Sequence, residues 1–167
     1  MRFARTPAEL LGSADDGYAA LEAAVDEAIA GLCAEGVGVM RRLLADTVEY
    51  TKQRRQFDAP IAANQVLQHR MVDMYMMLEQ AVSMTYLATL SLARPATERA
   101  RAVAAAKAFV SKAARFVGQS AIQLHGGMGM TDDLAVSHYF KRATMIGSQF
   151  GSADHHAARL EALATHA

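Results

Sequence analysis

The sequence predicts an all-α protein, an antiparallel four-helix bundle with a short extra helix on its C-terminal side. Apolar residues recur at spacings of three and four over long stretches, and the chain has no glycine between Gly38 and Gly118. Two of the three prolines, Pro60 and Pro95, interrupt the helical pattern. Long helices with short connections pack side by side in antiparallel bundles. No alternating strand pattern appears outside residues 1–11, which look like a fragment of another unit.

The first two helices are expected over residues 17–56 and 63–92. Asp16 or Gly17 can start the first, and the approach to Pro60 ends it, because the residue before a proline disfavours helical geometry. The second carries an apolar stripe with the spacing of a buried helix face. Its members are Leu67, Met71, Met74, Leu78, Ala81 and Ala88.

The third helix is expected over residues 96–124 and two shorter ones follow it. Thr131 or Asp132 can cap a fourth helix that runs to Met145, and Ser152 can cap a fifth that runs to Ala164. The third helix has apolar residues spaced by seven, the spacing of a seam between packed helices. They are Val103, Val110, Val117 and Leu124.

Composition excludes several classes of function. Lys plus Arg and Asp plus Glu number 17 each, so no overall charge attracts the chain to nucleic acid or an acidic membrane. The single cysteine, Cys33, cannot form an internal disulfide, and we expect a buried thiol. No apolar run reaches the roughly 18 residues of a membrane span, and no signal-peptide core is present. We expect a cytoplasmic protein.

Metal binding is not predicted. The chain contains no Glu-x-x-His pair, and the adjacent His155 and His156 would point roughly 100° apart on a helix. The methionine-rich run at 71–78 is typical of an adaptable core. Five basic residues of the third helix are expected to form a solvated face. These are Arg99, Arg101, Lys107, Lys112 and Arg115.

Residues 50–65, YTKQRRQFDAPIAANQ, form the first candidate binding cluster. Arginine binds phosphate through a planar pair of hydrogen bonds, which Arg54 could provide. The ring of Phe57 and the amides of Gln56 and Gln65 suit a heterocycle. The simpler alternative is that Arg54 is a charge at a helix C-terminus.

The second cluster lies in AIQLHGGMGM, residues 121–130. One glycine is enough to end a helix, yet three occur within four residues. Gln123 offers an amide, and Gly126 and Gly127 would let a ligand approach backbone N–H groups. A simple helix cap is the alternative for either glycine. The two clusters together predict a ligand with a phosphate and a polar ring system.

Both clusters resemble signatures of the C-terminal helical domain of acyl-CoA dehydrogenases. That family has an Arg-x-x-Phe-Gly turn followed by Pro-Ile and Gln, and a Gln-x-x-Gly-Gly-x-Gly loop. Here the turn is Arg54 to Asp58, followed by Pro60-Ile61 and Gln65, and the loop is Gln123 to Gly129. The resemblance extends over about residues 12–163. One departure is Asp58 in place of glycine.

The resemblance implies an FAD site and a larger subunit. Residues 12–167 would be the C-terminal helical domain, and residues 1–11 a remnant of the preceding middle β domain or a linker. Such bundles form homo- or hetero-oligomers, with FAD between the middle and helical domains and partly contacted by a neighbouring subunit. The implied FAD-binding residues are Arg54, Gln56, Phe57, Gln65, Gln123, Gly126, Gly127 and Ser152.

The resemblance also implies that the catalytic glutamate is missing. The family removes an α-proton from an acyl-CoA thioester with a glutamate base while hydride passes to the flavin. The two positions used for that base are Phe150 and Ala28 here, and Ile29 replaces a neighbouring arginine that assists CoA binding. Asp26 and Glu27 lie beside Ala28 but face other directions. The pattern suits the non-catalytic subunit of a heteromeric acyl-CoA dehydrogenase.

Two alternatives remain open at this point. One is a flavin-dependent oxidase or monooxygenase of the same fold, which needs no such glutamate. The other is a purely structural assembly module. For the chain by itself we expect a dimer or tetramer without retained flavin and without dehydrogenase activity.

Overall fold

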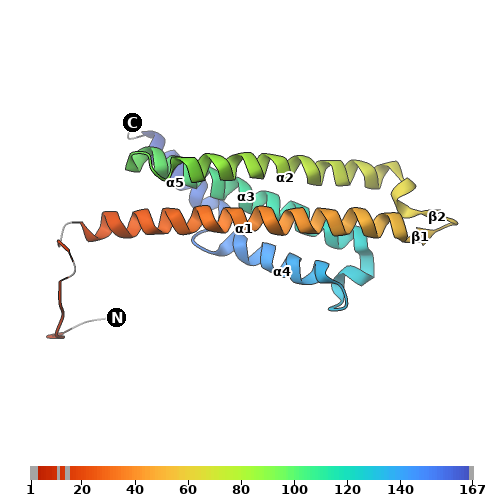
Figure 1. The fold of residues 1–167 in the computed structure, drawn as a ribbon, viewed down its shortest axis with the longest axis horizontal. Helices are drawn as coiled ribbons and strands as arrows, with labels where there is room; N and C mark the ends of the chain where they lie inside the picture. Colours follow the sequence, from red (N-terminus) through yellow and green to blue (C-terminus); the bar gives the residue numbers. More distant parts are fainter. Residues whose placement is uncertain (1–3, 11, 14–15, 166–167) are drawn as a thin grey trace.

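The computed structural model describes residues 4–10, 12–13 and 16–165, and within them the chain is a helical bundle (Figure 1). α1, α2 and α3 are long, and α4 and α5 are short. Residues 4–10 contain no strand and are exposed. The elements are α1 (Gly17–Gln53), β1 (Arg55–Gln56), β2 (Ala59–Pro60), the 3₁₀ turn η1 (Ile61–Ala63), α2 (Gln65–Ser91), α3 (Ala96–His125), the 3₁₀ turn η2 (Gly126–Met130), α4 (Ala135–Ser148) and α5 (Ala153–Thr165).

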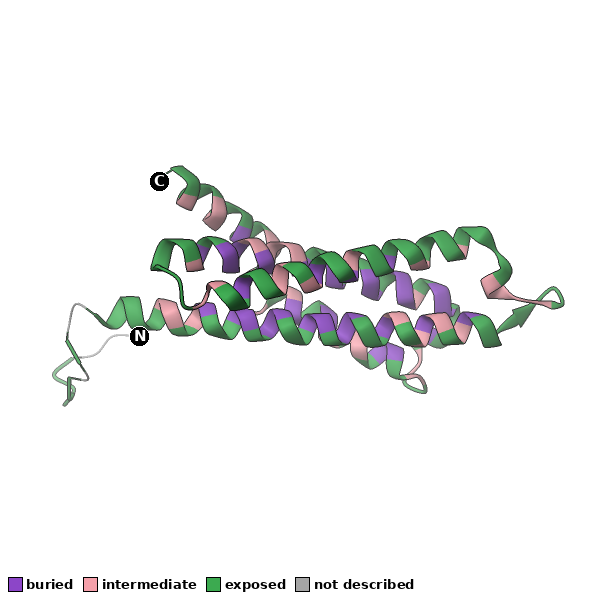
Figure 2. Ribbon diagram, turned by 45° about the horizontal axis from the view of Figure 1, so that its top comes forward, coloured by how far each residue is buried: buried purple, intermediate pink, exposed green. Residues whose placement is uncertain are grey.

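α3 is the central helix. It contacts α1, α2, α4 and α5, and its buried residues are mostly alanine and valine (Figure 2). Small side chains let helix axes approach closely, which explains how one helix can contact four others. The expected seam is confirmed, since Val103, Val110 and Val117 are fully buried and Leu124 nearly so.

The predicted stripe of α2 is also confirmed. Met74, Leu78, Ala81 and Ala88 are buried, and Leu67 and Met71 pack against the same core while remaining partly exposed. Cys33 lies in the core as a free thiol. Burial disfavours the thiolate and raises the pKa of Cys33 to about 11. Within the described residues, no helix combines the length and apolarity needed to cross a membrane.

The predicted end of the first helix at residue 56 is wrong by three residues. α1 ends at Gln53 because Arg54 adopts extended geometry, with φ −68° and ψ 122°. Residues 55–56 then pair with 59–60 as a two-residue antiparallel hairpin that sequence patterning did not predict. Phe57 and Asp58 form its loop with φ of 51° and 63°. Positive φ at both loop residues is the requirement of a type I′ turn.

The predicted caps of the fourth helix are wrong, whereas the cap of the fifth is confirmed. α4 starts only at Ala135, because Leu134 before it has extended geometry, with φ −109° and ψ 137°. The Thr131 hydroxyl donates to the Met128 carbonyl and Asp132 pairs with Lys141, so neither side chain caps the helix. At α5, the Ser152 hydroxyl accepts the His155 N–H at 3.2 Å. That bond satisfies one of the unpaired donors of the first helical turn.

Candidate functional site

The hairpin at the end of α1 presents the first predicted cluster to solvent. The N–H of Arg54 donates to the Tyr50 carbonyl, and its own carbonyl accepts the Ile61 N–H, both at 2.8 Å. The backbone is therefore fixed while the Arg54 side chain is exposed. Phe57, at the tip, is 97% exposed. A fully exposed phenylalanine on a fixed turn is available for a contact outside this chain.

The three glycines after α3 have different physical explanations. Gly126 has φ 60° and ψ −140°, a conformation that favours glycine. Gly129 is packed so that a Cβ would lie 3.0 Å from the Ile122 carbonyl oxygen. Gly127 has neither reason, because its φ is not positive and a Cβ would meet nothing within 4 Å. The described residues therefore give no steric or conformational reason for glycine at this position.

Tyr50 and His125 join the two clusters at one end of the bundle. Their rings stack with centroids 4.3 Å apart, and the Tyr50 hydroxyl donates to the His125 carbonyl at 3.3 Å. The His125 ring is buried, with Nδ1 2.8 Å from the Ala121 carbonyl. The hairpin and the turn after α3 accordingly share this end (Figure 1). No local pattern in the sequence predicts this pair, because residues of distant helices that come into contact leave no regular spacing along the chain.

Ser152 lies apart from the other seven predicted residues. It lines a groove of about 520 Å³ where α3, α4 and the start of α5 meet. The same groove offers two cations, one carboxylate, several hydroxyls and an aromatic ring, which come from Lys112, Arg115, Asp154, Ser111, Thr144, Ser148 and Phe140. The predicted residues therefore form two separate sites, one at the hairpin end and one along the side of the bundle.

Phe150 and the segment around Ala28 face a common cleft. It has a volume of about 270 Å³ and is lined by Val25, Ile29 and Phe150 among others. Phe150 has φ 54° and is 51% exposed. Ala28 is exposed and Ile29 is buried. Phe150 therefore shares a cleft with Ile29, the neighbour of Ala28 on α1, although Ala28 is not among the residues that line it, and neither Phe150 nor Ala28 has a side chain that can accept a proton.

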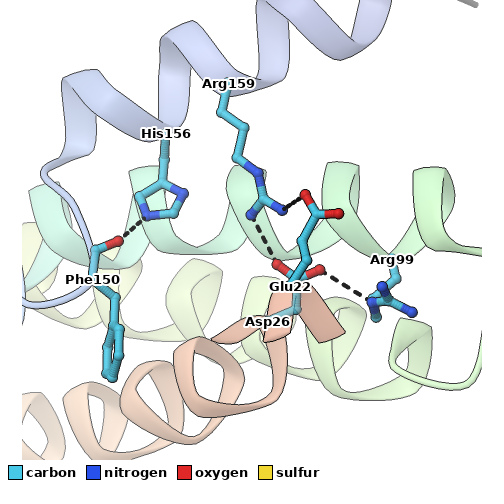
Figure 3. A network of polar contacts seen from close by, with 6 residues as sticks. All are labelled: Glu22, Asp26, Arg99, Phe150, His156 and Arg159. Atoms are coloured by element: carbon cyan, nitrogen blue, oxygen red, sulfur yellow. Dashed lines mark hydrogen bonds and ion pairs between the residues drawn. The ribbon is translucent and has the colours of Figure 1, made fainter. Parts of the chain in front are cut away.

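The carboxylates nearest to this cleft are engaged in ion pairs (Figure 3). Asp26 is 0% exposed, and its two oxygens accept from Arg99 at 3.1 Å and Arg159 at 2.8 Å. Glu22 lines the cleft and pairs with Arg159 at 3.4 Å. Glu27 is exposed and is not among the residues that line the cleft. Asp26 therefore ties α1 to α3 and α5, with both oxygens occupied.

Lys107 corrects the prediction of a solvated basic face. Its side chain is 0% exposed, and Nζ donates to the carbonyls of Ile146 at 2.9 Å and Gly151 at 3.0 Å and to the Ser111 hydroxyl at 3.0 Å. Burial lowers the pKa of Lys107. Arg99 is also partly buried on Asp26, whereas the other three basic residues are exposed.

Lys107 and His156 hold the turn that carries Phe150. His156 Nε2 lies 2.8 Å from the Phe150 carbonyl, while its Nδ1 is buried and has no hydrogen-bond partner among the residues that the structure describes. Positive φ at a phenylalanine persists only where neighbouring contacts fix it. The sequence of α3 does not predict that Lys107 holds this turn, because a buried lysine is rare.

Burial lowers the pKa of His156, the hydrogen bond with the Phe150 carbonyl partly opposes this, and nearby Lys107, His155 and Arg159 lower the pKa further. In the pH range from about 6.5 downward, the unfolded chain binds a proton that the folded chain resists. The free energy of unfolding should therefore fall as pH is lowered through that range. Urea unfolding between pH 7.5 and 5.5 measures this slope. His156→Gln should reduce it, and exposed His69→Gln should not; equal slopes in all three proteins would contradict the assignment.

Comparison with known proteins agrees with this architecture. The sequence profile described as "Acyl-CoA dehydrogenase, C-terminal domain" matches residues 15–162. Acyl-CoA dehydrogenase IpdE2 of Mycolicibacterium smegmatis is 36% identical over 137 residues, which cover 82% of this chain and 42% of that protein. The short-chain-specific acyl-CoA dehydrogenase of Megasphaera elsdenii is 32% identical over 142 residues, covering 83% and 36%. The chain spans about two-fifths of the length of these relatives.

Solved structures have the same helical arrangement. Butyryl-CoA dehydrogenase of Megasphaera elsdenii superposes with a TM-score of 0.84 at 26% identity, over 92% of this chain and 40% of that one. The ChsE4–ChsE5 complex of Mycobacterium tuberculosis gives 0.80 at 27% identity, over 86% and 39%.

Proposed function

The chain belongs to the acyl-CoA dehydrogenase family through its C-terminal helical domain, and we propose that it is the FAD-binding and oligomerising part of a subunit that lacks its own catalytic base. The complete assembly would dehydrogenate an acyl-CoA thioester at the α,β position. The observation that carries the proposal is that Phe150 and Ile29 line one cleft, at positions where the family resemblance implies a catalytic glutamate and an arginine that assists CoA binding.

The hairpin end fits the phosphate and ring portions of FAD. Arg54 supplies an exposed guanidinium from a fixed backbone, and Phe57 supplies an exposed ring beside it. Gly127 leaves bare backbone where no neighbour requires it. When bound, the flavin would accept the hydride from the substrate. The residues of this chain would bind and orient that cofactor.

Proton abstraction would depend on another subunit. Phe150 and Ala28 cannot accept a proton, and Asp26 is committed to two arginines. Two separate groups of predicted FAD residues, at the hairpin and around Ser152, support a flavin shared between chains of the same fold. A similar protein has been solved as the ChsE4–ChsE5 complex, which favours a heteromeric partner that supplies the base.

Arg54→Ala should weaken FAD binding to the complete assembly by roughly ten- to a hundred-fold, because a charge-assisted contact contributes about 1.5–3 kcal/mol. The measurement is flavin fluorescence during titration of the apoprotein. Lys52→Ala, an exposed cation of the last turn of α1, is the matched control. Equal affinity of the two variants would contradict the proposed phosphate contact.

Flavin content and substrate dependence of the complete assembly distinguish the proposed dehydrogenase from its two alternatives. Bound flavin that is reduced when an acyl-CoA is added supports the dehydrogenase. Flavin that reacts only with other substrates and oxygen would identify the oxidase or monooxygenase alternative. An assembly that never contains flavin would favour the remaining alternative, a purely structural assembly module.

A further inference from the structure

The groove beside Ser152 contains hydrogen-bond donors that have no acceptor among the described residues. It lies where α3, α4 and the start of α5 meet, and its volume is about 520 Å³. Pockets of about 300–1,000 Å³ with a few placed polar groups are typical of small-molecule sites. Neither the hairpin residues nor the glycines after α3 line this groove.

Ser111 is the buried donor of the groove. It is 6% exposed, and its Oγ accepts the Lys107 ammonium at 3.0 Å. That bond uses a lone pair of the oxygen, so the hydroxyl hydrogen is still available for donation. Within the part of the chain that the structure describes, nothing accepts this hydrogen. A buried donor without an acceptor is costly, and the ammonium bound to the same oxygen makes an anion the favoured acceptor.

Lys112 and Arg115 add two positive charges to the same wall. They follow Ser111 on α3, are exposed, and form no ion pair with any described residue. Ser152 contributes a hydroxyl whose oxygen accepts a backbone N–H of α5 at 3.2 Å, which leaves its hydrogen for a ligand. Asp154 is the one carboxylate among the described residues that line the groove, so positive charge is in excess.

Phe140 gives the groove an aromatic surface that is fixed against α3. Its ring packs on Gly118, where a Cβ would lie 2.9 Å from Phe140 Cδ2. Glycine inside a helix costs roughly 0.5–1 kcal/mol relative to alanine, and this packing accounts for its presence within α3. A ring held in this way offers a stacking surface to a flat heterocycle.

We propose that this groove binds a nucleoside diphosphate, with the phosphates at Ser111, Lys112 and Arg115 and the base against Phe140. Phosphate oxygens carry negative charge and accept several hydrogen bonds at once, which suits two cations beside two hydroxyl donors. Asp154 supplies an acceptor for the hydroxyl and amino groups of the nucleoside. The diphosphate is either a free nucleotide or part of a larger cofactor.

This inference goes beyond the proposed function and does not require it. Arg54 lies at the hairpin and Arg115 in the groove, so the two sites fail separately. In the complete assembly, ADP that displaces FAD would mean that the groove holds the diphosphate of the flavin itself. ADP that binds beside FAD would identify a separate nucleotide. Both cases require Arg115.

Calorimetric titration of ADP into the 167-residue chain tests the proposal. Saturable binding of one ADP per chain is expected, with a dissociation constant below about 1 mM. Arg115→Gln and Lys112→Gln should each weaken it by about ten-fold, because a charge-assisted phosphate contact is lost. Arg101→Gln is the matched control, since it makes the same change of charge on an exposed part of α3 outside the groove. It should bind ADP like the wild type.

Phe140→Leu separates the contribution of the base from that of the phosphates. It should weaken ADP binding by at least about five-fold, because stacking is lost, and should leave binding of inorganic pyrophosphate unchanged. Unchanged pyrophosphate binding also shows that the variant is folded at the groove. Absence of ADP binding at about 10 mM, or equal affinity of Arg115→Gln and Arg101→Gln, would overturn the proposal. Equal losses of ADP and pyrophosphate binding in Phe140→Leu would overturn the assignment to a nucleotide.

Discussion

Asp26→Ala is expected to lower the free energy of unfolding by about 3 kcal/mol, since removing one partner of a buried ion pair costs about 3–5 kcal/mol. Asp26 is 0% exposed and is the shared acceptor for Arg99 and Arg159. Without it, the partly buried guanidinium of Arg99 loses its counter-charge, Arg159 retains only Glu22, and α1 loses its ion pair with α3. Both arginines retain some access to water, which places the effect at the lower end of the range. Urea unfolding followed by circular dichroism measures it.

Asp46→Ala is the control for this effect. Asp46 pairs with Arg42 one turn away, and the arginine is largely exposed. Exposed pairs of this kind contribute about 0–1 kcal/mol. Equal destabilisation by Asp26→Ala and Asp46→Ala would contradict the structural role of the buried network.

Lys107→Met should lower the free energy of unfolding by about 2 kcal/mol, because the carbonyls of Ile146 and Gly151 lose a charged donor. The substitution also removes the free-energy cost of burying the Lys107 ammonium group, the same burial that lowers its pKa. This gain limits the loss of stability. Methionine retains the apolar stem, so loss of packing contributes little. Urea unfolding gives the magnitude, and hydrogen exchange should show faster opening of residues 146–156.

Lys141→Met removes an exposed lysine from α4 and should change stability by at most about 0.5 kcal/mol. If amide hydrogens of residues 146–156 exchange as slowly in Lys107→Met as in the wild type, Lys107 does not hold this turn.

The helices could be predicted from the sequence because the spacing of their apolar residues and the burial of those residues both follow from packing one helix face against the core. The seams of α2 and α3 are defined by residues three, four or seven apart, and those residues are in the core. Helix ends were less predictable. α1 stops at Gln53 because of hairpin pairing between residues 55–56 and 59–60, and two positive φ values in the loop leave little trace in Phe57-Asp58.

The parts of the candidate site that lie within one segment could be predicted from the sequence. The parts formed where distant segments meet could not. The Arg54 turn and the glycine tract are local patterns. The stacking of Tyr50 on His125, the burial of Lys107 and the double pairing of Asp26 depend on which helices are neighbours. The prediction that Lys107 is exposed was wrong because it relied on residue type, and lysine is ordinarily exposed. Four oxygens near its ammonium group make the burial possible.

Turnover of the complete assembly after Phe150→Ala measures whether this subunit carries a catalytic base of its own. Phe150 occupies the position at which the family resemblance places the catalytic glutamate, and its ring can neither take nor give a proton. With flavin content and assembly verified, turnover of Phe150→Ala should remain close to wild type. Phe150→Glu should not create activity in this subunit, because Ile29 stands where CoA binding would need a cation. Loss of turnover in Phe150→Ala with flavin and assembly unchanged would contradict the account and place the reaction on this chain.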